Sequence, residues 1–153
     1  MKMIKLVAVG KIKEEYYRKK VEEFLNETRK NAHIDIIELG DESIPKNPSN
    51  VVVQGIKKKE GMKILECIDN KDYVIALCIE GKLTDSSKLK EIVKSAFENM
   101  DGNVVFVIGG SLGLDDSVVS RANYKLSFSR MTFPHQMMRV MLMEQIANIT
   151  YRK

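Results

Sequence analysis

Residues 104–113 read VVFVIGGSLG, an unbroken apolar run that ends in a glycine-rich turn. Three other runs have the same character: KLVAV at 5–9, HIDIIEL at 33–39 and YVIALCI at 73–79. Continuous rather than alternating apolar runs indicate strands that are buried on both faces, as they are in parallel sheets. We therefore expect four buried parallel strands, each followed by a turn.

Helical patterns lie between and after these runs. Apolar residues recur at helical spacing within about 13–30, 51–69 and 89–100. A fourth helical segment, 134–149, begins at a proline and is apolar on nearly every side. The polar segment 43–50 is expected to be a disordered loop. This alternation predicts a single α/β domain over residues 1–153, with a mainly parallel sheet flanked by helices.

Composition excludes several classes of protein. Of the 153 residues, 44% are hydrophobic and 30% are charged, which is typical of a soluble globular protein and not of a disordered chain. No apolar run approaches the roughly 20 residues of a membrane span, and residues 1–6 (MKMIKL) do not resemble a signal peptide. We therefore expect a cytoplasmic protein without membrane contact. Its net charge of +4 favours a polyanionic partner but does not identify one.

Cysteine and histidine are too few to predict a metal centre. Cys67 and Cys78 lack the paired spacing of zinc or redox motifs, and we expect them to be buried, reduced thiols. With His33 and His135 as the two histidines, we expect no bound metal. His135 stands one turn from Arg139 in the last predicted helix, where a packed or ion-paired arginine is a simpler interpretation than a catalytic pair.

Glycine follows each predicted strand, at the edge where the ligands of open parallel sheets bind. These glycines are Gly10, Gly40, Gly81 and the group Gly109-Gly110-x-x-Gly113. They allow backbone amides to approach a ligand closely, although tight turns alone would also require them. The G-x-G-x-x-G and P-loop motifs are absent, so the sequence disfavours a conventional NAD or ATP site.

Three segments carry a family resemblance. Residues 77–82 (LCIEGK), 105–114 (VFVIGGSLGL) and 126–140 (LSFSRMTFPHQMMRV) closely resemble the RlmH family, the bacterial large-subunit rRNA pseudouridine N3-methyltransferases of the SPOUT superfamily. The similarity extends from VAVGK at 7–11 to about Ile146, which is most of the chain. The combination of Gly-Gly-x-x-Gly-Leu with Ser-x-Ser-x-Met-Thr-Phe-Pro-His is specific to that family.

The resemblance implies a SPOUT-type α/β fold with a C-terminal trefoil knot, which general topology rules would not predict. It also implies a homodimer with active sites completed across the interface, and S-adenosylmethionine as the methyl donor. The implied substrate is large-subunit ribosomal RNA on the assembled ribosome, methylated at N3 of a pseudouridine in a stem-loop. The donor-binding residues carried over by motif are Leu77, Gly109, Phe128, Ser129, Arg130, Met131, Thr132 and Phe133.

Catalytic residues follow less directly from the resemblance. A sulfonium methyl group is already activated, so the enzyme's main task is to align donor and acceptor, while cations hold phosphate or a developing anionic base. The candidates for catalysis are Arg130, Tyr151 and Arg152, with Lys82 and Lys153 as further cations.

The end of the chain departs from the family pattern. Family members follow the Glu-Gln-Ile equivalent with Tyr-Arg-Ala and a longer helix, whereas residues 147–153 here read ANITYRK, and Arg152 replaces a terminal histidine. That tail is thought to help form the nucleotide site. The alternative function is therefore a non-catalytic, cofactor-binding module associated with RNA or the ribosome.

Overall fold

The computed structural model describes residues 2–151, except for the side chain of His135. Its strands are β1 Ile4–Val9, β2 Ile34–Leu39, β3 Tyr73–Leu83, β4 Val104–Ile108 and β5 Tyr124–Ser127. They form one five-stranded sheet in the order β2-β1-β4-β3-β5, and every neighbouring pair is parallel. The predicted parallel α/β sheet is confirmed.

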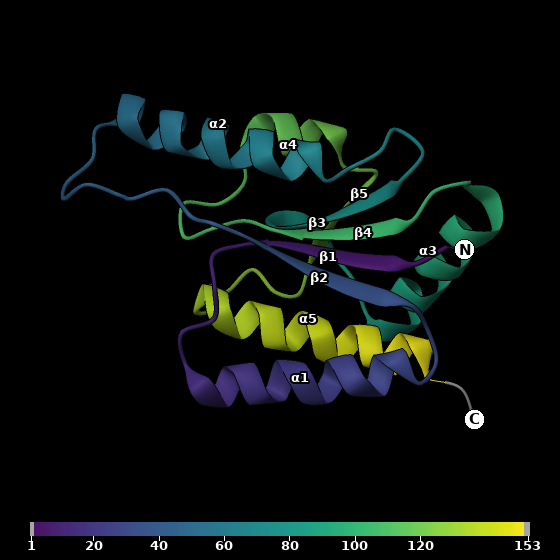
Figure 1. Cartoon of the computed structure of the whole chain (residues 1–153). Helices are drawn as coiled ribbons and strands as arrows, with labels where there is room; N and C mark the ends of the chain where they lie inside the picture. Colours follow the sequence, from purple (N-terminus) through teal and green to yellow (C-terminus); the bar gives the residue numbers. More distant parts are fainter. Residues whose placement is uncertain (1, 152–153) are drawn as a thin grey trace.

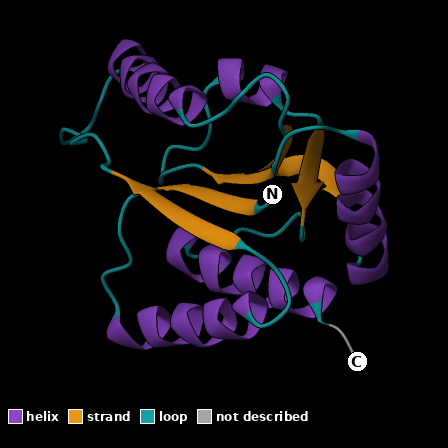
Figure 2. Cartoon of the chain, turned by 45° about the vertical axis from the view of Figure 1, so that its right-hand side comes forward, coloured by secondary structure: helices purple, strands orange, loops and turns teal. Residues whose placement is uncertain are grey.

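Helices cover both faces of the sheet (Figures 1 and 2). They are α1 Glu15–Arg29, α2 Asn50–Glu66, α3 Ser86–Asn99, α4 Asp116–Arg121 and α5 His135–Thr150. In Figure 1, α2 and α4 lie above the sheet, and α1 and α5 lie below it. Among residues 2–151, no helix is both long enough and apolar enough to cross a membrane.

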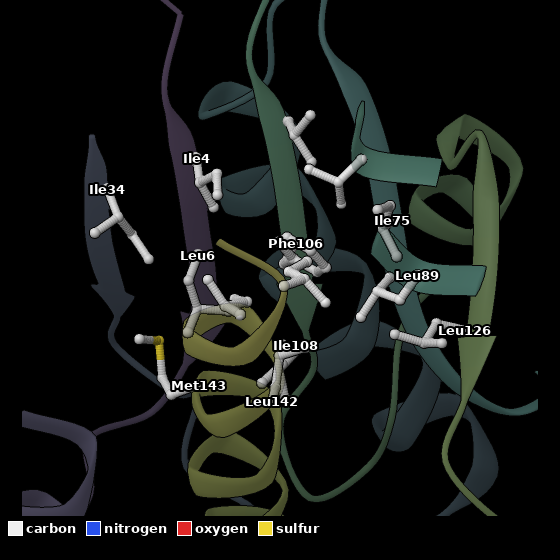
Figure 3. Close-up of a cluster of buried hydrophobic side chains, with 14 of the residues drawn as sticks. Ile4, Leu6, Ile34, Ile75, Leu89, Phe106, Ile108, Leu126, Leu142 and Met143 are labelled. Atoms are coloured by element: carbon white, nitrogen blue, oxygen red, sulfur yellow. The ribbon is translucent and has the colours of Figure 1, made fainter. Parts of the chain in front are cut away.

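Each face of the sheet has its own core, which explains the unbroken apolar runs. Leu6 and Phe106 point toward α5, where Figure 3 shows them beside Leu142. Val7 and Val105, their neighbours along β1 and β4, join the separate core under α2 and α4. Because β1 and β4 are central strands, alternation between apolar and polar residues would place polar side chains inside one of the two cores.

β5 is not among the predicted strands, and it alters the interpretation of β3. Its pairing with β3 breaks between Leu77 and Lys82 and then resumes, so β3 continues to Leu83 instead of ending at residue 79. Gly81 therefore lies inside a strand, and its predicted place in a turn after the strand is wrong. A Cβ atom on Gly81 would lie 2.6 Å from the carbonyl oxygen of Lys125, so β3 and β5 approach each other too closely for any side chain there.

Helix α5 buries much of its apolar surface within its own chain. It packs against α1, α3 and the sheet through Leu142, Met143, Ile146 and Ile149. The helix itself is confirmed with bounds one residue from those predicted. The trefoil knot stays a prediction, because strand order and register do not trace how the chain is threaded.

Candidate functional site

A cleft of ≈ 470 Å³ opens beyond the carboxyl end of β4, between the break in β3 and the segment that joins β5 to α5. Its size is in the range of small-molecule sites. The lining residues are 77–79, 108–111, 113–114, 127–129, 131–134 and Met138. Three stretches far apart in sequence thus meet at the edge of the sheet where ligands of open α/β folds bind.

The glycine-rich turn after β4 forms one wall of this cleft. Gly113 has a positive φ of 88°, and its N–H donates to the carbonyl oxygen of Gly110 at 3.0 Å. A Cβ atom on Gly109 would lie 2.9 Å from the carbonyl carbon and oxygen of Gly113 and from Cδ2 of Leu114. Only glycine fits at position 109, because two of these three atoms are backbone and cannot move without opening the turn.

The opposite wall is held in place by two serines. The Oγ atom of Ser127 lies 3.0 Å from the carbonyl oxygens of Ile79 and Ser129, so it ties the break in β3 to the loop after β5. The Oγ atom of Ser129 accepts a hydrogen bond from the N–H of Met131 at 3.0 Å. Ser127 is buried, and although it belongs to the family motif, it is not among the donor-binding residues predicted from that motif. Its signal in the sequence is the Ser-x-Ser alternation that places it beside a predicted site residue.

Most residues of the predicted donor site meet in this cleft. Those that line it are Leu77, Gly109, Phe128, Ser129, Met131, Thr132 and Phe133. Arg130 does not line it: its side chain is exposed, and Nη1 lies 3.4 Å from the carbonyl oxygen of Ile79. Lys82 is also exposed, with Nζ 5.9 Å from the ring centre of Tyr124.

The candidate residues at the end of the chain lie elsewhere. Tyr151 follows α5, which starts directly after the cleft residue Pro134 and runs away along the sheet (Figure 1). At about 1.5 Å per residue, the 16 residues of α5 carry the chain about 24 Å from the cleft. Tyr151 is exposed there. Arg152 and Lys153 lie outside the described residues. The structure therefore does not bring Tyr151 to the cleft of its own chain.

Both cysteines are half-buried, so the prediction that they are buried is wrong, whereas their free state agrees with it. Cys78 lines the cleft, because the break in β3 turns it away from the sheet core. Burial raises the pKa of both thiols, with the carboxylate of Glu80 adding to the effect at Cys78. Neither thiol has the lowered pKa of a nucleophile. Within residues 2–151, no three histidine, cysteine or carboxylate side chains gather as metal ligands would.

Arg139, near the start of α5, has a structural role. Its guanidinium group is buried and donates to Oε2 of Glu38 at 2.6 Å and to the carbonyl oxygen of Gly10 at 2.9 Å. It also donates to the carbonyl oxygen of Val9 at 3.3 Å. The interpretation of Arg139 as an ion-paired residue is confirmed, and it ties α5 to the carboxyl end of β1.

The cleft is suited to an uncharged, flat group with a few polar atoms. None of its described lining residues is charged, and the apolar side chains of Leu77, Leu114 and Phe128 face it beside exposed backbone groups of the glycine turn. Backbone donors and acceptors recognise the edges of a heteroaromatic ring without an acidic side chain. This explains how the cleft can serve a nucleoside although the usual nucleotide motifs are absent.

The chain is similar to known proteins over nearly its whole length. Residues 1–152 match a family described as "Predicted SPOUT methyltransferase". The chain is 50% identical over 143 residues to a "Ribosomal RNA large subunit methyltransferase H" of Clostridioides difficile (strain 630), covering 94% of this chain and 90% of that protein. Proteins of the same name from Lactococcus lactis subsp. cremoris (strain SK11) and Bacillus pumilus (strain SAFR-032) are each 48% identical, with the same coverage.

Proposed function

Because the chain belongs to the SPOUT methyltransferase family, we propose that it transfers the methyl group of S-adenosylmethionine to large-subunit ribosomal RNA. The acceptor we propose is N3 of a pseudouridine in a stem-loop, methylated on the assembled ribosome. The names of the relatives support the RNA substrate, and the motifs at 105–114 and 126–140 support the modified atom. Such a substrate places the protein in the cytoplasm, with the ribosomes.

The observation that carries the donor site is the packing of Gly109. Its Cα faces the backbone of Gly113 so closely that no side chain fits, and both glycines line the cleft. The tight packing inside the turn fixes the backbone of both glycines at the cleft wall, while Leu77 and Leu114 offer apolar contact for an adenine ring. The residues present fit the adenosine part of S-adenosylmethionine.

The chain's own residues act mainly by alignment. When bound, S-adenosylmethionine supplies a methyl group on sulfonium sulfur that needs no further activation. Ser127 and Ser129 hold the loop at 128–133 in one shape, so the donor and the attacking nitrogen can be oriented without a covalent intermediate. The N3 proton of the base must leave during transfer. No described cleft residue carries a carboxylate or an imidazole, so we assign the proton to water.

We propose a homodimer because the cleft of one chain lacks the cations that an anionic substrate needs. Arg130 is exposed next to the lining residues Ser129 and Met131, and Tyr151 lies at the far end of α5. Large apolar side chains are exposed in the cleft lining, namely Ile79 and Met131, and at the end of β3, namely Leu83. A second subunit that covers these side chains would bury apolar surface and could bring its own tail to the cleft.

Methyl transfer to purified ribosomes tests the proposed function. Assembled ribosomes from a strain that lacks the gene should accept one labelled methyl group on the large subunit from S-adenosylmethionine when the protein is added. Mass spectrometry should find that methyl group on a pseudouridine that is unmethylated in the deletion strain and methylated in its parent. Identical rRNA modification in both strains would contradict the proposal and favour the non-catalytic alternative.

A further inference from the structure

Glu60 is a buried carboxyl group that the proposed reaction does not use. It lies on α2 with 4% of its surface exposed, whereas ionisable side chains are seldom buried to that degree. A Cβ atom built on Gly110 would lie 3.2 Å from Oε1 of Glu60 and 3.5 Å from Oε2. The carboxyl group therefore packs directly against the backbone of the glycine turn, next to the cleft wall that Gly110 forms.

The two oxygens of Glu60 have different surroundings. Oε2 accepts a hydrogen bond from the N–H of Glu42 at 3.2 Å, in the loop after β2. Oε1 is buried and has no hydrogen-bond partner among the described residues. An apolar side chain of similar size would fill this space without the cost of burying a carboxyl group. Stability alone thus does not account for a glutamate at this position.

We propose that Glu60 is a positioning residue for the donor cleft. Its carboxyl group joins the loop after β2, through Glu42, to Gly110, and so sets where the turn at 109–113 lies against the cleft. It also crowds position 110, because Oε1 of Glu60 and Cγ1 of Val9 lie 3.2 and 3.3 Å from the place that a Cβ atom would take. The inference rests on the proposed function, since it takes the cleft to bind S-adenosylmethionine.

A double-mutant cycle between positions 60 and 110 tests direct action. Gly110→Ala alone places a methyl group 3.2 Å from Oε1 of Glu60. If the carboxyl group holds its position, the turn gives by a few tenths of an ångström, and we expect the Kd for S-adenosylmethionine to rise about tenfold. Glu60→Asp withdraws the carboxyl group by one methylene and makes room for that methyl group. In the Glu60→Asp background, Gly110→Ala should therefore raise the Kd by a factor at least about fivefold smaller than it does in the wild type. The effects of substitutions at residues in contact are not additive. Isothermal titration calorimetry measures all four proteins.

Conservative replacement separates positioning from bulk packing. Glu60→Gln keeps the shape and an acceptor for the N–H of Glu42, so its Kd should stay within about twofold of wild type, whereas Glu60→Ala should weaken donor binding about tenfold. Glu66→Ala, an exposed position on the same helix, is the matched control and should not change Kd. Thermal unfolding of every variant shows whether it is folded, and the Asp and Gln variants carry the test if Glu60→Ala does not fold.

The outcomes distinguish the two proposals. A wild-type protein that does not bind S-adenosylmethionine overturns the proposed function and this inference with it. A wild-type protein that binds the donor, combined with additive effects at positions 60 and 110, overturns only the role of Glu60. An unchanged Kd in folded Glu60→Ala does the same.

Discussion

At the scale of single residues, the shape of the site depends on glycine, which has no Cβ atom. Gly109→Ala adds a Cβ atom 2.9 Å from the backbone of Gly113, so we expect the turn to open and the Kd for S-adenosylmethionine to rise at least tenfold. Gly40→Ala is the matched control, because no atom lies within 4 Å of the added methyl group. Calorimetry on both folded variants checks this, and equal Kd values would show that the turn at Gly109 does not shape the donor site.

Glu60 should also make the stability depend on pH. Burial, with the carboxylates of Asp41 and Glu42, raises its pKa above the ordinary value of 4.5, while the hydrogen bond from the N–H of Glu42 and the charge of Lys63 oppose the effect. Between 4.5 and the raised value, the folded protein binds a proton that the unfolded chain has released, so the free energy of unfolding falls as pH rises. We expect the stability of Glu60→Gln, relative to wild type, to increase with pH over this interval.

Urea unfolding at a series of pH values measures that difference. The wild-type and Glu60→Gln curves of unfolding free energy against pH should diverge above about pH 4.5. Glu66→Gln, on the exposed side of α2, should keep the slope of the wild type. Parallel curves for Glu60→Gln and wild type would mean that burial does not shift the pKa of Glu60.

At the scale of elements, α2 contains two glycines that the same substitution should affect in opposite directions. Gly55 has no atom within 4 Å of an added Cβ atom, so Gly55→Ala should raise the free energy of unfolding by about 0.5–1 kcal/mol through helix propensity. A Cβ atom on Gly61 would lie 3.0 Å from Cβ of Asp115 and 3.3 Å from Cγ2 of Val118. Gly61→Ala should therefore lower it by about 1–3 kcal/mol.

This pair of variants tests whether α4 packs on α2 as the structure describes. Both substitutions have the same helix propensity, so the difference between them isolates the contact with α4. Chemical denaturation with a shared baseline gives the two values. If both substitutions stabilise the protein by the same amount, α4 does not lie against Gly61.

At the scale of the whole molecule, the distance between the cleft and the tail predicts that each active site combines the cleft of one chain with the tail of its partner. Deletion of residues 151–153 should leave donor binding unchanged and reduce methyl transfer to ribosomes at least tenfold. The Gly109→Val variant should be inactive because it loses the donor. A mixture of the two variants should recover part of the activity, since a mixed dimer combines an intact cleft with an intact tail.

Sedimentation at micromolar concentration completes this test. We expect a dimer, and Leu83→Asp should weaken it, whereas Val51→Asp, at an exposed apolar position on α2, should not. A fully active monomer, or a mixture with no recovered activity, would show that each chain's tail serves its own cleft or none.

Cys67→Ser and Cys78→Ser should retain activity, because raised thiol pKa values do not suit a nucleophile.

The sequence by itself determined the parallel sheet and the main wall of the cleft. The runs at β1 and β4 are apolar at every position or nearly so because both faces of these strands are buried, and such burial leaves a local pattern. The turn at Gly109 was predictable for a related reason, since a position that excludes every side chain must be glycine. The family motifs added Leu77 and the loop at 128–133.

Tertiary structure alone decided three other features. β5 is four residues long and half polar, so its pairing with β3, and the break that turns Cys78 into the cleft, leave no periodic signal. Glu60 contacts Gly110, which lies 50 positions further along the sequence. Glu60 belongs to the charged run KKKE at 57–60 of α2, which gave no reason to expect a buried carboxyl group. Tyr151 is carried away from the cleft by the length and direction of α5. Local patterns encode which residues are buried, whereas contacts between distant segments depend on how the whole chain packs.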